Sequence, residues 1–203
     1  MKFRSVALLA GAGALLGGCN YNYQAVPDPS VSQKDAQYLA LVPKVNTGMQ
    51  FERYRVDDPT GEAPGTIVVD TRNKYLYFVE PGRKAIRYGV ATGQEAYGWT
   101  GVATVGKKAE WPHWMPPADM LERWPHLAPT ARAGGLPGGP DNPLGSRALY
   151  LYDGNKDTMY RIHGTNEPET IGRGASSGCI RMRDIDAIDL YKRVKVGTKV
   201  VVS

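Results

Sequence analysis

The chain has 203 residues, of which 42% are hydrophobic and 22% are charged, a composition typical of a folded soluble protein rather than a disordered one. The formal net charge is +5, but the basic residues are scattered instead of forming a stripe, which argues against a nucleic-acid-binding protein. The 24 glycines, 15 prolines and 12 tyrosines favour a fold rich in strands and loops.

Residues 1–18 have the pattern of an export signal. Two basic residues at the start precede an apolar run over 6–16 that is too short to span a bilayer. The run ends in Leu-Gly-Gly-Cys at 16–19, which resembles the lipobox of bacterial lipoproteins. That resemblance implies that Cys19 is lipidated, and Asn20 after it fits outer-membrane retention in a Gram-negative cell. The alternative is a plain signal peptide in which Cys19 is incidental.

Residues 19–64 are predicted to be a tether and an irregular lead-in. The part up to Gln33 is polar, contains prolines and lacks periodicity, so we expect it to stay extended. The part from Ala36 to Arg55 contains scattered apolar residues. We expect that part to dock on the folded domain as an irregular arm, and it offers no candidate site.

Strand patterns mark the start of a domain predicted over 65–203. Apolar runs at 66–70 and 75–79 flank a short polar segment, which predicts a hairpin. Alternating residues over 85–92 predict a third strand. Such short spacing indicates an antiparallel meander and leaves no room for a nucleotide-binding βαβ unit.

The segment 98–145 contains all four tryptophans and many prolines, with few signals of regular structure beyond one helical turn at 119–123. A loop of this length inside a compact domain is usually functional. We therefore consider it a substrate lid, with the alternative that its aromatic residues only anchor an irregular loop to the core.

The last third of the chain returns to strand patterns at 147–153, 159–163 and 199–202, with an amphipathic helix over 184–193. Together these elements predict a mainly β domain, a sandwich or barrel. It should contain one or two short helices and a long Pro/Trp-rich loop.

The stretch 160–183 holds His163, one of three histidines, and Cys179, one of two cysteines. If Cys19 is lipidated or removed, Cys179 is alone in an exported protein, either as a small buried apolar residue or as a reactive thiol. A free thiol has a pKa of about 8.5 and needs a base to act as a nucleophile, for which His163 is the candidate. The alternative for His163 is a structural histidine at a strand end.

The neighbours of Cys179 suit acyl transfer. Gly178 and Cys179 offer adjacent backbone N–H groups that could form an oxyanion hole, and Arg181 and Arg183 could bind a carboxylate. The sequence contains neither a Cys-x-x-Cys nor a His-Glu-x-x-His pattern, so we expect no metal and no cofactor.

The motif His-Gly-Thr-Asn at 163–166 and the motif Ser-Ser-Gly-Cys-Ile-Arg-Met at 176–182 closely resemble the signature of L,D-transpeptidases of the YkuD/ErfK type. The resemblance extends over about 65–203. It implies an L,D-transpeptidase-like β-sandwich or barrel of mixed strands, and a cysteine-dependent acyltransferase that acts on peptidoglycan in cell wall biogenesis and cell shape. Cys179 would form a thioester with the diaminopimelate carbonyl of a tetrapeptide stem, release D-alanine and pass the stem to an amine.

The resemblance also implies roles for other residues. His163 would move the proton and be oriented by a backbone carbonyl near Gly164, while the backbone of Gly178 would line the oxyanion hole. Arg181 is expected to hold the donor stem, with Asn166 and Ser177 beside the substrate. Many family members carry histidine at the position of Ser177, so position 177 is not expected to supply the base.

The implied partners are peptidoglycan stem peptides, an amine acceptor and the membrane that holds the lipid on Cys19. The acceptor could be a second stem, giving a 3-3 crosslink, or an outer-membrane protein or lipoprotein. We expect a periplasmic location and covalent inhibition by carbapenems. Two alternatives stay open: a carboxypeptidase or amidase that uses water as acceptor, and a non-catalytic lipoprotein that only binds the wall.

Overall fold

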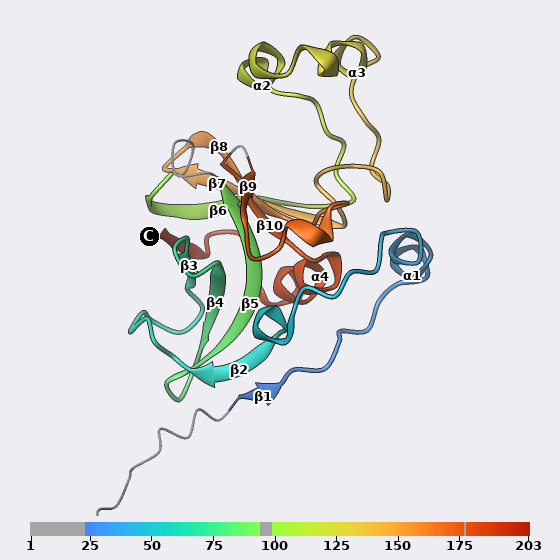
Figure 1. Ribbon diagram of the computed structural model, residues 1–203. Helices are drawn as coiled ribbons and strands as arrows, with labels where there is room; N and C mark the ends of the chain where they lie inside the picture. Colours follow the sequence, from blue (N-terminus) through green and yellow to red (C-terminus); the bar gives the residue numbers. More distant parts are fainter. Residues whose placement is uncertain (1–22, 94–98, 177) are drawn as a thin grey trace, which may run out of the picture.

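The computed structural model describes residues 23–93, 99–176 and 178–203, and its centre is a closed β-barrel of mixed strand direction (Figure 1). The order around the barrel is β5, β10, β8, β7, β6, β11, β3 and β4, after which β4 pairs with β5. Most neighbours are antiparallel, but β10 runs parallel to β8 and β11 parallel to β3. The mainly β barrel with few short helices is therefore confirmed. The barrel strands are β3 (Ile67–Asp70), β4 (Tyr75–Glu80), β5 (Lys84–Gly93), β6 (Gly101–Glu110), β7 (Arg147–Asp153), β8 (Lys156–His163), β10 (Ile180–Met182) and β11 (Lys199–Val202).

The barrel interior is filled by apolar side chains that alternate with outward-facing residues along each strand. Each fully buried Val, Leu or Ile side chain contributes roughly 1.5–3 kcal/mol relative to its exposed state. Helix α4 (Asp184–Arg193) joins this core through Ala187 and Leu190. The phenol of Tyr88 donates a 2.6 Å hydrogen bond to Asp189 of α4, so the helix is held to the barrel by packing and by a buried polar contact. The fully buried core side chains of the largest volume are Tyr88, Ile67, Leu76, Ile86, Leu151, Ile162, Met182, Ile188, Leu190, Val69, Val79 and Val90.

The sequence predicted the β3–β4 hairpin, strand β7 and helix α4, and all three are present. Strand β6 lies in the segment expected to have little regular structure, so that expectation was wrong there. Only Ala103 and Val105 in its first half are buried. A β-bulge at Gly106 then shifts the register, and a Cβ there would lie 2.4 Å from the ring of Tyr152. The bulge interrupts the two-residue alternation by which a strand is recognised.

The lead-in contains more regular structure than the extended tether and irregular arm expected for residues 19–64. Its described part forms β1 (Gln24–Ala25), α1 (Gln33–Leu39), the 3₁₀ turn Met49–Phe51 and β2 (Tyr54–Asp57). Strand β2 adds to the sheet by antiparallel pairing with β5. Buried Arg53 bonds Asp186 of α4 at 2.8 Å and Asp28 at 2.8 Å, so the arm is held at several points.

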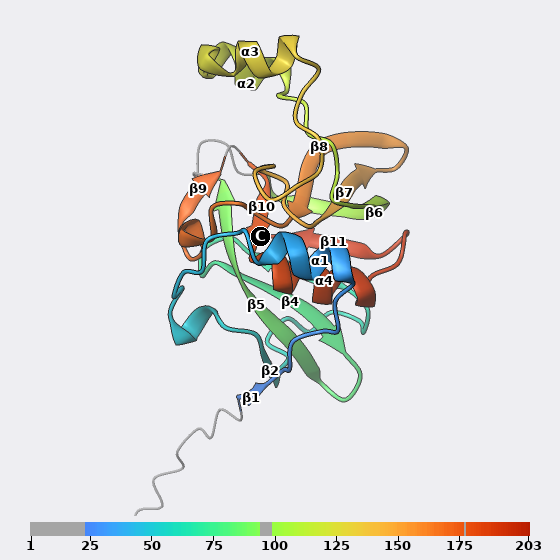
Figure 2. The same cartoon turned by 90° about the vertical axis from the view of Figure 1, so that its right-hand side faces the viewer.

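The segment between β6 and β7 leaves the barrel and carries two short helices, α2 (Ala118–Arg123) and α3 (Ala128–Arg132). We call residues 112–145 the cap. Figures 1 and 2 show both helices standing off from the barrel on two extended connections. No helix in the described part of the chain has the length and apolar character needed to cross a membrane.

Candidate active site

His163 and Cys179 are brought together by two neighbouring parallel strands. His163 ends β8, and Cys179 immediately precedes β10. The register pairs Arg181 with His163 and Ile180 with Ile162, which places Cys179 next to Arg161. Because side chains alternate along strands, the two isoleucines point into the barrel and the other four side chains point outward on one face.

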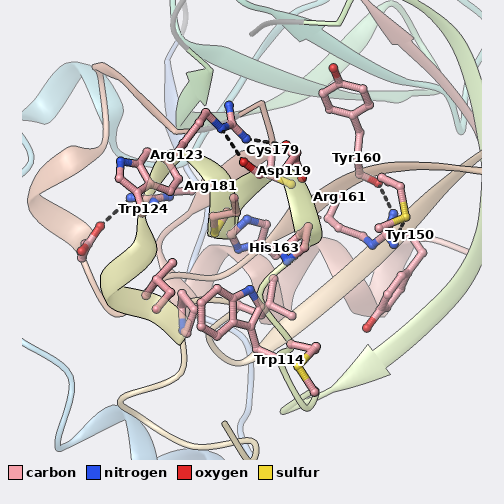
Figure 3. Close-up of a pocket in the computed structure, with 18 of the residues that line it drawn as sticks. Trp114, Asp119, Arg123, Trp124, Tyr150, Tyr160, Arg161, His163, Cys179 and Arg181 are labelled. Carbon is pink, nitrogen blue, oxygen red and sulfur yellow. Dashed lines mark hydrogen bonds and ion pairs between the residues drawn. The ribbon is translucent and has the colours of Figure 1, made fainter. Parts of the chain in front are cut away.

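These four outward side chains form the floor of an open cavity of about 750 Å³. Figure 3 shows His163, Cys179 and Arg181 pointing into the same space, with Arg161 beside them. The walls come from the cap and from neighbouring parts of the barrel. The apolar wall residues from the cap are Trp114, Met115, Pro117, Met120, Trp124, Leu127, Pro143 and Leu144.

The imidazole of His163 is buried and has one defined partner. Its Nδ1 lies 2.6 Å from the carbonyl oxygen of Gly164. The pKa of His163 is lowered to about 3, mainly by burial and next by the positive charge of Arg181, while the Gly164 bond acts in the opposite direction. The ring is therefore neutral near pH 7. Because a carbonyl oxygen can only accept, Nδ1 carries the proton and Nε2 is left as an acceptor that can serve as a base.

Gly164 lies against the side chain of Asp184, a residue that was not predicted from the sequence to be part of the site. Asp184 Oδ1 accepts a 2.7 Å hydrogen bond from the Ser146 amide, and the Gly164 amide donates to the Arg147 carbonyl at 2.9 Å. A Cβ on Gly164 would lie 1.9 Å from Asp184 Oδ1, so only glycine fits. Burial raises the pKa of Asp184 to about 6, against the lowering effect of its bonds with Ser146 and Thr165. In the sequence, the only indication that Asp184 has a structural role beside Gly164 was its place as an acidic residue at the start of a helix.

Cys179 is a partly exposed thiol. Burial of the sulfur raises the pKa of its thiol, and a hydrogen bond from the Arg161 backbone together with the charges of Arg161 and Arg181 offsets part of this shift. At neutral pH the pair is therefore a neutral thiol beside a neutral imidazole. Such a thiol becomes a nucleophile only when a base removes its proton during attack.

Of the other expected site residues, Gly178 and Asn166 are described by the structure. Gly178 is buried and has φ 132°, a conformation that favours glycine. Asn166 is not among the described residues that line the cavity, and its side chain donates to the Asp141 carbonyl at 3.1 Å. Ser177 and Cys19 lie outside the described residues, so their expected roles stay predictions.

The charged groups on the cavity floor have partners within the protein. Arg181 bonds Glu167 at 2.6 Å. Arg161 forms a bidentate ion pair with Asp157, with hydrogen bonds of 2.7 and 2.9 Å. Glu167 is itself a cavity residue that the sequence reading did not single out. An incoming carboxylate would therefore compete with Glu167 for the guanidinium of Arg181.

Two of the four tryptophans support the expected lid, since Trp114 and Trp124 line the cavity. The other two have packing roles. Trp99 stacks on Tyr160 with ring centroids 5.7 Å apart, and Trp111 is buried at the base of the cap. Within the described residues, no group of three or more His, Cys, Asp or Glu side chains could hold a metal ion.

A thiol and a neutral, carbonyl-bonded imidazole on the floor of an open cavity are typical of the cysteine-dependent acyl-transfer enzymes. Residues 64–202 match the family model of the L,D-transpeptidase catalytic domain, YkuD. The chain therefore belongs to the YkuD family of L,D-transpeptidase catalytic domains.

Three comparisons illustrate the family relationship. "Probable L,D-transpeptidase YcfS" of Escherichia coli K12 is 37% identical over 140 residues, which is 66% of this chain and 42% of that protein. "Putative L,D-transpeptidase in ATP synthase subunits region ORF 5" of Fuscovulum blasticum is 29% identical over 199 residues, 97% of this chain and 95% of that protein. A Brucella melitensis crystal structure is 48% identical, covers 83% of this chain and 99% of that chain, and superimposes with a TM-score of 0.52.

These relatives differ from the chain in length and from one another in name. The chain spans less than half the length of the curated relative from Escherichia coli. The Brucella structure is named a probable carnitine operon oxidoreductase, whereas the family model and the curated relatives are L,D-transpeptidases. The family assignment depends on the latter two.

Proposed function

We propose that the protein is a peptidoglycan L,D-transpeptidase with Cys179 as nucleophile and His163 as proton carrier. The observation that carries this proposal is the position of the two side chains on adjacent parallel strands of a YkuD domain, facing one cavity. The neutral imidazole, with Nδ1 bonded to Gly164, presents Nε2 as the base that a neutral thiol requires.

The first half-reaction follows from these protonation states. Cys179 Sγ attacks the carbonyl carbon between diaminopimelate and the terminal D-alanine while His163 Nε2 takes the thiol proton. The tetrahedral intermediate collapses with cleavage of the C–N bond, and the imidazolium returns that proton to the leaving amine. D-Alanine departs, and a thioester joins the stem to Cys179.

The second half-reaction reverses the proton path. An amine acceptor attacks the thioester carbonyl, His163 takes a proton from the attacking nitrogen, and the C–S bond breaks. The proton returns to the sulfur, so the enzyme recovers its neutral thiol and imidazole. In both halves the Gly164 carbonyl stabilises the imidazolium that forms briefly, in the place that a carboxylate occupies in many triads.

We propose that the backbone N–H groups at Gly178 and Cys179 stabilise the developing oxyanion. The φ of Gly178, 132°, supports a backbone conformation specialised at this point. Loss of one such donor typically costs about 10²–10³ in kcat.

Substrate binding is proposed to use Arg181 for a carboxylate of the donor stem, with displacement of Glu167 from its 2.6 Å contact. Guanidinium groups suit carboxylates because they can donate two parallel hydrogen bonds. Ser177 and Asn166 stay predicted substrate contacts. The acceptor is proposed to be an amine of a second stem or of an envelope protein, and the protein is proposed to act in the periplasm, anchored through a lipid on Cys19.

Intact-mass spectrometry with a carbapenem tests the nucleophile. We expect one covalent adduct on the folded wild-type protein and none on Cys179→Ala. No adduct on the folded wild-type protein would support the non-catalytic wall-binding alternative instead.

Product analysis with a purified disaccharide tetrapeptide tests the acceptor. A crosslinked or amine-transferred product that requires an added amine supports transpeptidation. Release of D-alanine with only a hydrolysed tripeptide, whether or not an amine is present, would identify the carboxypeptidase alternative.

A further inference from the structure

Helix α1 of the lead-in reaches the point where the cap joins the barrel. The two ends of the cap meet at Trp111 and Ser146, where the Trp111 amide donates to the Ser146 carbonyl at 2.8 Å. Asp35 of α1 bonds both sides of this neck. Its carboxylate accepts from Trp111 Nε1 at 2.8 Å and from the guanidinium of Arg147 at 2.9 and 2.8 Å.

The carboxylate of Asp35 is built into a defined position. It is only 3% exposed, and a reciprocal capping box with Ser32 fixes it at the start of α1. Burial alone would raise the pKa of Asp35, but the hydrogen bonds from Arg147 and Trp111 hold it well below its usual range. Asp35 is therefore charged at neutral pH.

Trp111 supplies a second, independent observation. Its φ is 42°, a left-handed conformation that a large side chain adopts only when its surroundings impose it. Part of the constraint comes from within the cap, because Gly138 lies so near that a Cβ there would be 1.8 Å from the Trp111 carbonyl oxygen. Helix α1 also contacts Trp111, through the bond to Asp35 and through Tyr38, whose ring meets the indole edge-on with ring centroids 4.8 Å apart.

The neck leads directly to the cavity. The chain passes from Trp111 to Trp114, which pairs by two backbone hydrogen bonds of 2.9 and 2.8 Å with Leu136 on the returning connection. Trp114 lines the same cavity as Cys179 and His163. Figures 1 and 2 show α1 beside α4, at the foot of the two connections that carry α2 and α3.

We propose that helix α1 braces the neck of the cap, and that Asp35 is the positioning residue that holds the cap walls over the cavity. The brace lies outside residues 64–202, which match the catalytic family. The lead-in is thereby part of the substrate-binding apparatus, and the catalytic domain is incomplete without it. Asp35 touches no reacting atom and acts only through Trp111 and Arg147.

Hydrogen–deuterium exchange of the full chain tests the brace without any assumption about the reaction. We expect Asp35→Asn to speed exchange of the amides of Trp111, Trp114 and Leu136 by about tenfold or more. The charge-assisted bonds of Asp35 oppose local opening at the neck, and the substitution weakens them. Peptides from the β3–β4 hairpin should keep the wild-type rate. Asp28→Asn is the matched control, because Asp28 pairs with Arg53 on the same arm and its side chain is 75% exposed.

Two outcomes of this experiment would overturn the brace. One is unchanged exchange of the neck in folded Asp35→Asn. The other is an equal increase in the neck and in the hairpin, which would make Asp35 a contributor to global stability only. If Asp35→Asn does not fold, Trp111→Phe removes the same hydrogen bond from the other partner and keeps an aromatic ring in place.

A kinetic comparison separates positioning of the cap from activation of the thiol. In Asp35→Asn we expect KM for the donor peptide to rise about tenfold, as for a loosened binding wall. The rate constant for alkylation of Cys179 by iodoacetamide should stay within about twofold of wild type, because this small reagent does not need the cap. A fall in the alkylation rate constant as large as the fall in kcat/KM for the donor peptide would overturn the assignment to the cap. Loss of the proposed reaction in the wild type would leave the exchange result unaffected, so the two proposals fail separately.

Discussion

Replacing Gly164 by alanine should disable the base while leaving the nucleophile in place. The added Cβ would lie 1.9 Å from Asp184 Oδ1 and 2.8 Å from the Ser146 nitrogen. Ordinary contacts of this kind are 3.4 Å or longer, so atoms here must shift by more than about 1 Å. Because the bond from the Ser146 amide holds Asp184 Oδ1 in place, we expect the backbone at 164 to move, and such a displacement can cost about 10²-fold in rate. The same movement carries away the carbonyl that bonds His163 Nδ1 at 2.6 Å.

The assay for Gly164→Ala is the second-order rate of carbapenem acylation, followed by intact mass, beside a thermal unfolding curve. We expect acylation to fall about 100-fold and stability to fall by about 1–3 kcal/mol from overpacking. Gly139→Ala is the matched control, since nothing lies within 4 Å of its added Cβ. A folded Gly164→Ala protein that is acylated at the wild-type rate would refute the view that the Gly164 carbonyl orients His163.

Three further predictions follow from the charges around the site. The folded-state pKa of His163, about 3, lies below its unfolded value of 6.5. The contribution of the neutral imidazole to stability is therefore complete above pH 6.5 and is lost as the pH falls toward 3. We expect Tm to drop less over this pH range in His163→Gln than in wild type. The pKa shift of Asp184 has the opposite sign, because its folded-state pKa of about 6 lies above its usual value of 3.8. Ionisation of Asp184 therefore lowers stability as the pH rises between these two values. Asp184→Asn should therefore raise Tm at pH 8 relative to wild type and have little effect at pH 4, and an equal shift at both pH values would contradict the assignment. Glu167→Gln frees Arg181 from a partly exposed ion pair, which contributes about 1 kcal/mol or less. KM for a donor peptide should therefore fall by up to about fivefold. An increased KM would show that Glu167 itself binds the donor.

The sequence predicted the parts of the fold that depend on local patterns. The β3–β4 hairpin and α4 have clean periodicities, and both occur where expected. Strand β6 was missed because the bulge at Gly106 exchanges the faces of the strand partway along it. Its two buried residues before the bulge are too few to set a pattern.

The candidate site was predicted by a resemblance and not by geometry derived from the chain. Sixteen residues separate His163 and Cys179, and periodicity does not show that β8 and β10 pair in parallel across the loop between them. Contacts that join distant parts of the chain were not predictable either. Asp35 and Arg147 are 112 residues apart, and each alone looks like an ordinary surface charge.

The protonation states explain why a carbonyl can replace a carboxylate beside His163. A carboxylate would raise the pKa of His163 and favour a thiolate–imidazolium pair in the resting enzyme. Here burial and Arg181 keep the imidazole neutral, and burial keeps the thiol protonated. In the proposed reaction the proton would therefore move only during attack, when the substrate carbonyl is in place. A donor carboxylate that displaces Glu167 would exchange one negative partner of Arg181 for another, so the charge beside His163 would stay paired and the imidazole neutral while the donor binds.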